Sequence, residues 1–225
     1  MCKSFMCERT NNYNIIKDKE KVRAICVMGS VVMIDIDSII VNSTSQATFE
    51  FNQRYGCNFN YQDTDEWKIF IKWGEEIGLS DKEASKFSEW VWHDPVVLSR
   101  CPPIIGAKPL VYKLLNKGVD VHLLTARKHF LENMTKVWVK KWLPRVDLSK
   151  IHHEEDKSRI INKFEAAALI DDAQHNIKVI LEDTQAYGIL VPFGKTVVTL
   201  PEHERLIIFS RGIQNQNLWP LYDAI

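Results

Sequence analysis

The chain has 225 residues, of which 45% are hydrophobic and 26% are charged. This composition is typical of a globular protein with a sizeable core, or with a core domain and a smaller insert. The 29 Lys and Arg residues balance the 29 Asp and Glu residues, which argues against a strongly basic nucleic-acid surface and against a membrane-attracted face.

The cysteines and the first residues indicate the compartment. The five cysteines are widely spaced and form no Cys-x-x-Cys pair, which argues against a disulfide framework and against a zinc site and fits a reducing compartment. Residues 1–21 are polar and charged, unlike a signal peptide, and no apolar run is long enough to span a bilayer. We therefore expect a soluble, cytoplasmic protein in which residues 1–21 are a loose N-terminal extension.

Two apolar stretches open the predicted core. Residues 22–28 are apolar enough for a short strand that a turn signal ends. In residues 31–41, four apolar residues lead into Asp35 and Asp37, and a further apolar run follows. This pattern is typical of a strand buried on both faces, as in a parallel sheet. Because side chains alternate along a strand, Asp35 and Asp37 should project to the same side.

Residues 43–94 differ in character, because they are rich in aromatic side chains and contain two predicted helices. The helices are expected over 66–77 and 81–92, and Ser80 with Glu83 forms a capping box for the second. We interpret this segment as a small helical cap inserted directly after the first core strand. Most of its aromatic residues should form the cap's own core; the alternative is that a few of them line a ligand slot.

From residue 95 onward, predicted strands alternate with predicted helices. The strands are expected over 119–124, 166–170, 187–191 and, as a short one, 197–200. The helices are expected over 107–116, 128–142, 158–164 and from 176 on. Residues 219–222 should pack against the core. The alternation predicts an α/β fold with a doubly wound parallel sheet, formed by residues 22–42 and 95–225 around the cap at 43–94.

Polar residues close three of these strands. Asp35 and Asp37 follow the first, Thr125 the second, and Asp171 with Asp172 the third. In a parallel sheet these ends meet at one edge, where open α/β folds bind ligands. Clustered carboxylates repel one another unless a cation lies between them, and Mg²⁺ prefers carboxylate, water and phosphate oxygens. The sequence therefore predicts a Mg²⁺ site at this edge.

The arrangement suits phosphoryl transfer. Mg²⁺ held by Asp35 and the late acidic pair would neutralise phosphate charge, and Lys157 with the Thr125 hydroxyl would hold the remaining phosphate oxygens. Asp35 would attack phosphorus and form an aspartyl-phosphate. Asp37 would protonate the leaving oxygen and later activate water.

Taken together, the four motifs resemble the haloacid dehalogenase superfamily of phosphatases. The resemblance rests on Asp35-Ile36-Asp37 after an apolar strand, Thr125 in Val-His-Leu-Leu-Thr, Lys157, and Asp171-Asp172 in Ala-Leu-Ile-Asp-Asp. It implies that Asp35 is the nucleophile and that Asp37 is the general acid/base and gives Mg²⁺ its backbone carbonyl. It also implies that Asp172, with Asp171, completes the metal site.

A narrower resemblance is to the cytosolic and mitochondrial 5′(3′)-deoxyribonucleotidases. It rests on Cys101-Pro-Pro-Ile-Ile-Gly-Ala-Lys-Pro-Leu, Val-His-Leu-Leu-Thr-Ala-Arg and Leu-Ile-Asp-Asp. Those enzymes also have a small helical cap, whose aromatic residues hold the nucleobase. The resemblance implies a Mg²⁺-dependent 5′-nucleotidase that acts on nucleoside (deoxy)monophosphates.

Two stretches depart from these families. Ser38 follows Asp37 where many superfamily members have a glycine that eases the turn. Ala126 and Arg127 follow Thr125 where deoxyribonucleotidases often have Ser-Pro. Both are candidates for phosphate binding, and Arg127 has the alternative of a solvated helix start.

The polar segment 151–157 holds the lysine of the third motif. Lys163 competes with Lys157 for that role, and we favour Lys157 because Lys163 falls within a predicted helix. The neighbouring His152 and His153 are adjacent in sequence, not spaced along one helix face, so a solvated acidic loop is a simpler interpretation than a transition-metal site.

Three rival functions use the same motifs: hydrolysis of another small phosphomonoester, hydrolysis at a polynucleotide end, and binding without catalysis on the same fold. The neutral charge weakens the polynucleotide version, because phosphate backbones require a basic track. Intact acidic motifs weaken the binding version, although a fold alone does not fix function. We expect a small phosphorylated partner and no membrane, and we leave a homodimer open.

Overall fold

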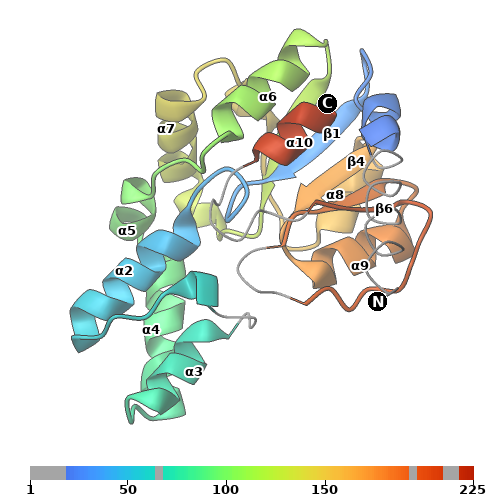
Figure 1. The fold of residues 1–225 in the computed structure, drawn as a ribbon. Coiled ribbons are helices and arrows are strands. Elements are labelled where there is room, and N and C mark those ends of the chain that lie inside the picture. Colours follow the sequence, from blue (N-terminus) through green and yellow to red (C-terminus); the bar gives the residue numbers. More distant parts are fainter. Residues whose placement is uncertain (1–18, 64–67, 193–196, 210–217) are drawn as a thin grey trace, which may run out of the picture.

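The computed structural model describes residues 19–63, 68–192, 197–209 and 218–225 (Figure 1). Within them the core is one six-stranded sheet in the order β3-β2-β1-β4-β5-β6, and every neighbouring pair is parallel. The strands are β1 (Val31–Asp35), β2 (Asp120–Thr125), β3 (Ile151–His153), β4 (Ala168–Asp171), β5 (Tyr187–Leu190) and β6 (Leu206–Ile208). The chain runs outward from β1 to β3 and then restarts at β4 on the other side of β1. The predicted doubly wound α/β fold is thus confirmed.

Helices cover both faces of the sheet. One face packs against α6 (Ala107–Asn116), α7 (Glu132–Trp142), α10 (Trp219–Ala224) and the helical residues 19–25. The other face packs against α8 (Lys157–Lys163) and α9 (Gln174–Asp183). Short 3-10 turns lie at His129–Leu131 and Leu148–Lys150. The predicted packing of residues 219–222 on the core is confirmed, and no helix in the described ranges is long and apolar enough to cross a membrane.

Side chains of the strands alternate between these two layers. In β1, Val32 and Ile34 point to the layer of α6, whereas Met33 points to the layer of α8 and α9. The approach of α9 to the sheet is close, because a Cβ at Gly188 would lie 2.7 Å from Ile177 Cγ2. The alternation decides which polar residues at the strand ends can meet one another.

Two predicted strands in the core are wrong, and two observed strands were not predicted. Residues 19–25 are helical, so the strand expected over 22–28 does not form. Val22, Ile25 and Cys26 are buried at a spacing of three and four residues, which matches a helix face. No strand forms over 197–200, and β3 and β6 lie in stretches for which no strand was predicted. Most of the expected N-terminal extension lies outside the described residues.

The cap helices extend from the core beyond the carboxyl end of β1 (Figure 1). They are α2 (Ser43–Tyr55), α3 (Ile69–Glu76), α4 (Asp81–His93) and α5 (Pro95–Arg100), with a 3-10 turn at Tyr61–Asp63. The predicted capping box of Ser80 and Glu83 is present at the start of α4. The part of the first predicted cap helix that falls at 66–67 lies outside the described residues.

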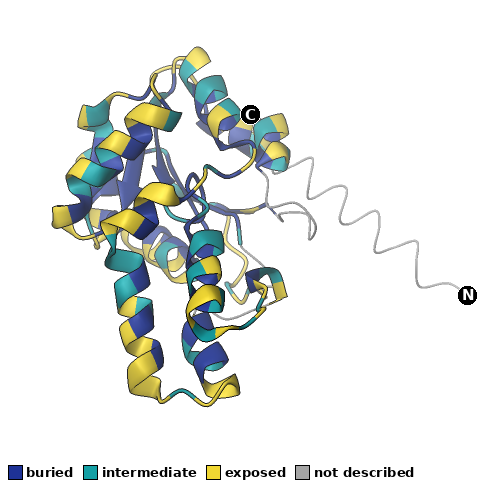
Figure 2. Ribbon diagram, turned by 90° about the vertical axis from the view of Figure 1, so that its left-hand side faces the viewer, coloured by how far each residue is buried: buried dark blue, intermediate teal, exposed yellow. Residues whose placement is uncertain are grey.

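An aromatic cluster separate from both sheet layers fills the cap. Phe51 is at its centre, with ring centroids of Tyr55, Phe87 and Phe70 at 4.8, 5.1 and 5.6 Å. In the cap, buried residues lie on the helix sides that face one another, and exposed residues lie on the outer sides (Figure 2). Most cap aromatics therefore serve the cap's own core. Val97 of α5 also joins this cluster, so the cap boundary at residue 94 stays a prediction.

Candidate active site

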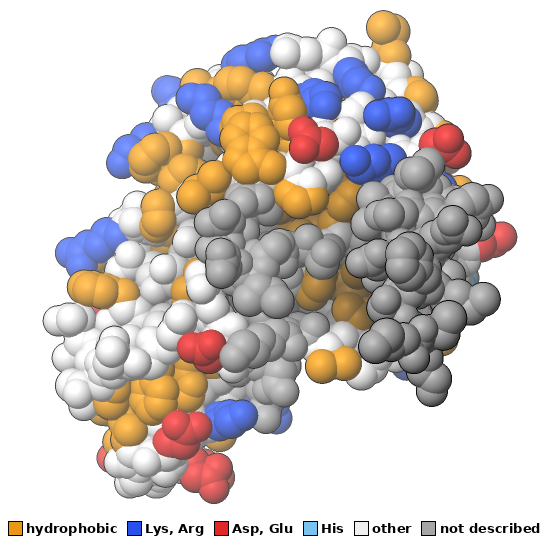
Figure 3. Space-filling view, viewed as in Figure 1, with side chains coloured by type: hydrophobic (Ala, Val, Ile, Leu, Met, Phe, Trp, Pro, Cys, Tyr) orange, Lys and Arg blue, Asp and Glu red, His pale blue; other side chains and the backbone are white. Residues whose placement is uncertain are grey.

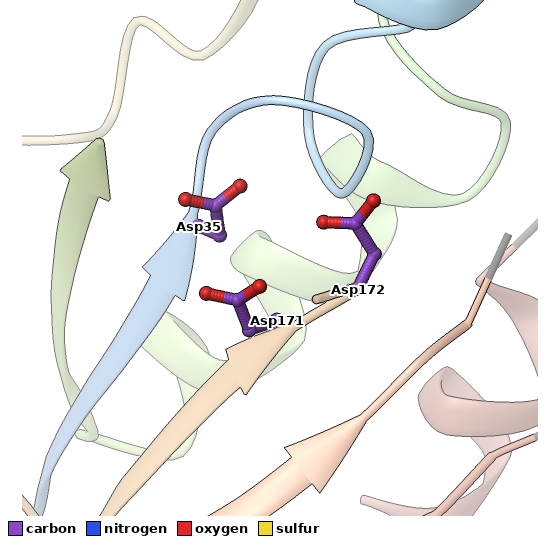
Figure 4. A group of neighbouring side chains, drawn as sticks. All are labelled: Asp35, Asp171 and Asp172. Atoms are coloured by element: carbon purple, nitrogen blue, oxygen red, sulfur yellow. The ribbon is translucent and has the colours of Figure 1, made fainter. Parts of the chain in front are cut away.

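The acidic residues of the first and last motifs meet where the strand order reverses. Asp35 ends β1 and Asp171 ends the adjacent β4. The alternation places Asp35 on the face of Met33, and Asp171 on that of Leu169, so both carboxylates face the α8 and α9 layer. Asp172 follows directly, and one oxygen from each of the three aspartates lies within 4.8 Å of the others (Figure 4). Open α/β sheets bind ligands at this switch point.

Lys157 joins this acidic cluster because it is the first residue of α8, which packs on the same face. Its Nζ donates hydrogen bonds to Asp35 Oδ1 at 2.5 Å and to Asp171 Oδ2 at 2.6 Å. Burial alone would lower the pKa of Lys157, but the two carboxylates outweigh it and raise the pKa above its ordinary value. The competing Lys163 instead lies over the Phe164 ring, with its Nζ 5.2 Å from the ring centroid.

The Asp171 carboxylate is fixed by several donors. Its Oδ1 accepts from the Ala173 N–H at 2.8 Å, and the Asn176 side-chain amide donates to Oδ1 at 3.2 Å and to Oδ2 at 3.0 Å. Both oxygens of Asp171 are thus engaged by protein donors. Asn176 was not among the predicted site residues. Its place in the first turn of the helix after the acidic pair is the signal that could have found it.

The donor set fits a divalent cation. Burial raises the pKa of Asp35, Lys157 opposes this effect, and the carboxylates of Asp171 and Asp172 raise the pKa further. Including Asp37, four carboxyl groups face two cationic side chains, so a further cation would favour the ionised form of all four. Oxygen ligands with uncompensated negative charge are what Mg²⁺ requires.

Asp37 lies in a turn, because β1 ends at Asp35 and does not continue to residue 41. Ser38 has a φ of 59° and its N–H donates to the Val41 carbonyl at 2.8 Å, so the chain reverses there. The serine thus adopts the left-handed backbone for which glycine is the usual residue. Burial alone would raise the pKa of Asp37, but the guanidinium of Arg127 outweighs it and lowers the pKa below its ordinary value.

Thr125 and Arg127, which belong to the second of the four motifs, both contact Asp37. Thr125 Oγ1 donates to Asp37 Oδ2 at 3.3 Å and accepts from the Arg127 N–H at 3.1 Å. Arg127 holds Asp37 with Nε and Nη2, at 2.8 and 2.7 Å. In this arrangement the Thr125 hydroxyl and the Arg127 guanidinium bind protein groups. Ala126 faces the cavity.

A cavity of about 280 Å³ opens at these strand ends. Its lining includes every predicted site residue except Thr125, and it also includes Ser38, Trp92, His93, Ala173, His175 and Asn176. Trp92 and His93 come from the end of α4, so the cap closes one side of the cavity. His93 was not predicted, although its place at the end of a cap helix that returns to the core could have drawn attention to it.

Comparisons with known proteins identify the fold. No family model and no curated protein matches the chain. Among solved structures, a haloacid dehalogenase hydrolase of family IA from Entamoeba histolytica is 16% identical, with a TM-score of 0.52 over 87% of this chain and 98% of its own. A haloacid dehalogenase-like family hydrolase from Streptococcus pneumoniae is 12% identical, with a TM-score of 0.52 over 81% and 94%. The chain therefore has the fold of the haloacid dehalogenase-like hydrolases.

Proposed function

We propose that this protein is a Mg²⁺-dependent phosphatase that hydrolyses phosphomonoesters through an aspartyl-phosphate. The observation that carries the proposal is the buried cluster of Asp35, Asp171 and Asp172 at the switch point of the sheet, with Lys157 between two of its carboxylates. The haloacid dehalogenase-like fold and the order of the four motifs support the same chemistry.

The roles of the side chains follow from their contacts. Asp35 Oδ1 accepts from Lys157, so we assign the attack on phosphorus to Oδ2. The new Oδ2–P bond forms as the bond from phosphorus to the leaving oxygen breaks, and Asp37 gives a proton to that oxygen. Water then attacks phosphorus as the Oδ2–P bond breaks, and Asp37 takes a proton from that water. This proton restores the acid form of Asp37 that the first step requires, and release of inorganic phosphate leaves Asp35 free. Bound Mg²⁺, held by Asp35 and Asp172 with Asp171 and the Asp37 carbonyl, would supply positive charge to the phosphate oxygens.

The substrate we propose is a nucleoside monophosphate, in keeping with the resemblance to deoxyribonucleotidases. The cavity is of a size for a small molecule, and Trp92 on its cap side offers an aromatic face on which a base could stack. On the face in Figure 3, the Lys and Arg side chains lie mainly over the upper part of the molecule, among hydrophobic, acidic and other side chains. We keep the cytoplasm as the expected location and a homodimer as an open arrangement.

The experiment that tests this function is phosphate release from a panel of compounds. The panel holds ribo- and deoxyribonucleoside 5′- and 3′-monophosphates, sugar phosphates and a 3′-phosphorylated oligonucleotide, each with Mg²⁺ and with EDTA. We expect Mg²⁺-dependent release that is concentrated on a few nucleotides. Release from sugar phosphates alone would support the phosphatase chemistry and contradict the nucleotide substrate. Folded protein that releases phosphate from no compound in the panel would favour a binding protein.

Substitution of Trp92 tests whether the site recognises the base of a nucleotide or only its phosphate. We expect Trp92→Ala to raise KM for the best nucleotide about tenfold, since loss of stacking costs on the order of 1–3 kcal/mol per base, and to leave hydrolysis of p-nitrophenyl phosphate within about twofold. Phe49→Ala on the exposed side of α2 is the matched cap control. An equal loss for both substrates would contradict base stacking by Trp92.

A further inference from the structure

We propose that Arg127 is a positioning residue for Asp37 and not a ligand of the substrate phosphate, and that Thr135 in turn holds Arg127. The inference rests on the proposed phosphatase function, because Asp37 is its general acid/base. It changes the role that the sequence suggested for Arg127.

The guanidinium is committed to protein groups. Nε donates to Asp37 Oδ2 at 2.8 Å and Nη2 donates to Asp37 Oδ1 at 2.7 Å, so the two planar groups pair through two parallel hydrogen bonds. Nη1 donates to Thr135 Oγ1 on α7 at 3.3 Å. The Arg127 side chain is 3% exposed, whereas that of Asp37 is 28% exposed. Both residues line the cavity, but Asp37 is the more exposed member of the pair.

The backbone of Arg127 is anchored as well. Its N–H donates to Thr125 Oγ1 at 3.1 Å, and its carbonyl accepts from His153 Nδ1 at 3.1 Å. These contacts tie the residue to the ends of β2 and β3, which are neighbours in the sheet. A side chain fixed at its backbone and at its guanidinium cannot follow a phosphate that enters and leaves. It is well suited to hold another side chain in one place.

Asp37 needs such support because of where it lies. It occupies a turn after β1, next to the left-handed Ser38, and not a strand that would fix its direction. Each carboxylate oxygen has two lone pairs. Arg127 and Thr125 both donate to Oδ2, whereas Arg127 Nη2 donates to Oδ1, so Oδ1 is the oxygen better able to carry the proton for the leaving group. Proton transfer depends on such placement, because a shift of about 1 Å can cost on the order of 100-fold in rate.

A double-mutant cycle on turnover of the best substrate tests the inference. We expect Arg127→Met to lower kcat on the order of 10- to 100-fold with KM within about twofold, and Asp37→Asn to lower kcat on the order of 100-fold or more. In the Asp37→Asn background, Arg127→Met should have no further effect beyond about twofold, because its partner is already lost. Thr135→Val, which removes one hydrogen bond, should lower kcat a few-fold, and Arg127→Lys should restore part of the loss.

The opposite role predicts the opposite pattern. If Arg127 bound phosphate, Arg127→Met would raise KM and the inhibition constant of inorganic phosphate about tenfold or more, and it would do so equally in the Asp37→Asn background. Arg145→Met is the matched control, because Arg145 is exposed and bonds Asn116 away from the site. Wild-type protein without any phosphate release would overturn the proposed function, whereas active wild-type protein with independent effects of the two substitutions would overturn only the role of Arg127.

Discussion

The carboxyl edge of the sheet and the cap bury opposite kinds of side chain. The edge buries Asp35, Asp171, Asp172, Lys157 and Arg127, whereas the cap buries aromatic rings around Phe51. Buried charges bring a large desolvation cost that pairing only partly offsets, but buried aromatic rings are strongly stabilising. The edge therefore holds buried charged groups at a cost in stability, while the buried rings of the cap stabilise a core of its own.

Changes at the two regions should therefore separate activity from stability. A substitution at the edge should reduce turnover and leave the free energy of unfolding nearly unchanged. A substitution inside the cap should reduce the free energy of unfolding first.

Asp35→Asn should have the largest effect. Since it removes the proposed nucleophile, we expect phosphate release to fall on the order of 10⁴-fold or more. The free energy of unfolding should stay within about 1 kcal/mol or rise, because like charges no longer crowd a buried site. Phosphate assays and urea unfolding would be run beside the exposed Asp183→Asn as control. Substantial turnover in Asp35→Asn would remove this residue as the nucleophile.

Phe51→Ala should have the largest effect on stability. The ring is fully buried at the centre of the cap cluster, and removal of such a ring costs about 3–5 kcal/mol. Phe49→Ala lies two residues away in the same helix at a side chain that is 55% exposed, so we expect a change within about 0.5 kcal/mol. Urea unfolding followed by tryptophan fluorescence would compare the two. Equal losses would mean that the cap has no core of its own.

Magnesium should stabilise the edge specifically. A cation that binds the folded chain at a hundred times its dissociation constant adds about 2.7 kcal/mol to the free energy of unfolding. We expect this gain for the wild type, its reversal by EDTA, and its loss in Asp172→Asn. Asp183→Asn should keep the gain, since that carboxylate lies at the far end of α9. An unchanged gain in Asp172→Asn would place the ion elsewhere.

The set of polar side chains that meet at the carboxyl edge was predictable, because chain order and the geometry of a parallel sheet determine it. Apolar strands followed by Asp35, Thr125 and Asp171 must meet at one edge once the sheet is parallel, and α8 brings Lys157 to the same face. The sequence did not reveal that Arg127 pairs with Asp37, because that contact depends on the turn at Ser38. The hydrophobic pattern of the sequence does not reveal such a turn.

Short strands and helices were also difficult to predict from the sequence. β3 and β6 have three residues each, which is too few for an alternating pattern to appear. Residues 22–25 were mistaken for part of a strand, because a short apolar run has the same appearance in a buried strand and in a buried helix. The error at β3 mattered most, since residues 151–157 were interpreted as a solvated loop. Instead, β3 places His152 beside His122 of β2, where Nδ1 of His122 and Nε2 of His152 are 2.8 Å apart.

This histidine pair predicts a loss of stability in mild acid. Burial, together with the nearby His122 and Lys163, lowers the pKa of His152 to about 4. Burial also lowers the pKa of His122, although the carboxylate of Asp120 acts in the opposite direction. Asp147 and Lys150 also face His122. In the unfolded chain a histidine binds its proton near pH 6.5. Only the unfolded state is then protonated between about pH 6.5 and 4, so stability must fall as the pH is lowered through this window.

The expected effect is small, because solvent screens the partly exposed ring of His152. Between pH 7.5 and 5.0 we expect the pair to lower the melting temperature by about 2–4 °C, which corresponds to about 1 kcal/mol. His152→Gln cannot titrate but can still hydrogen-bond His122, so it should flatten the pH dependence, whereas the exposed His203→Gln should not. Thermal melts across this range without bound Mg²⁺ would measure the difference. Parallel curves for His152→Gln and the wild type would mean that the acid sensitivity arises from other groups, such as the carboxylates of the edge.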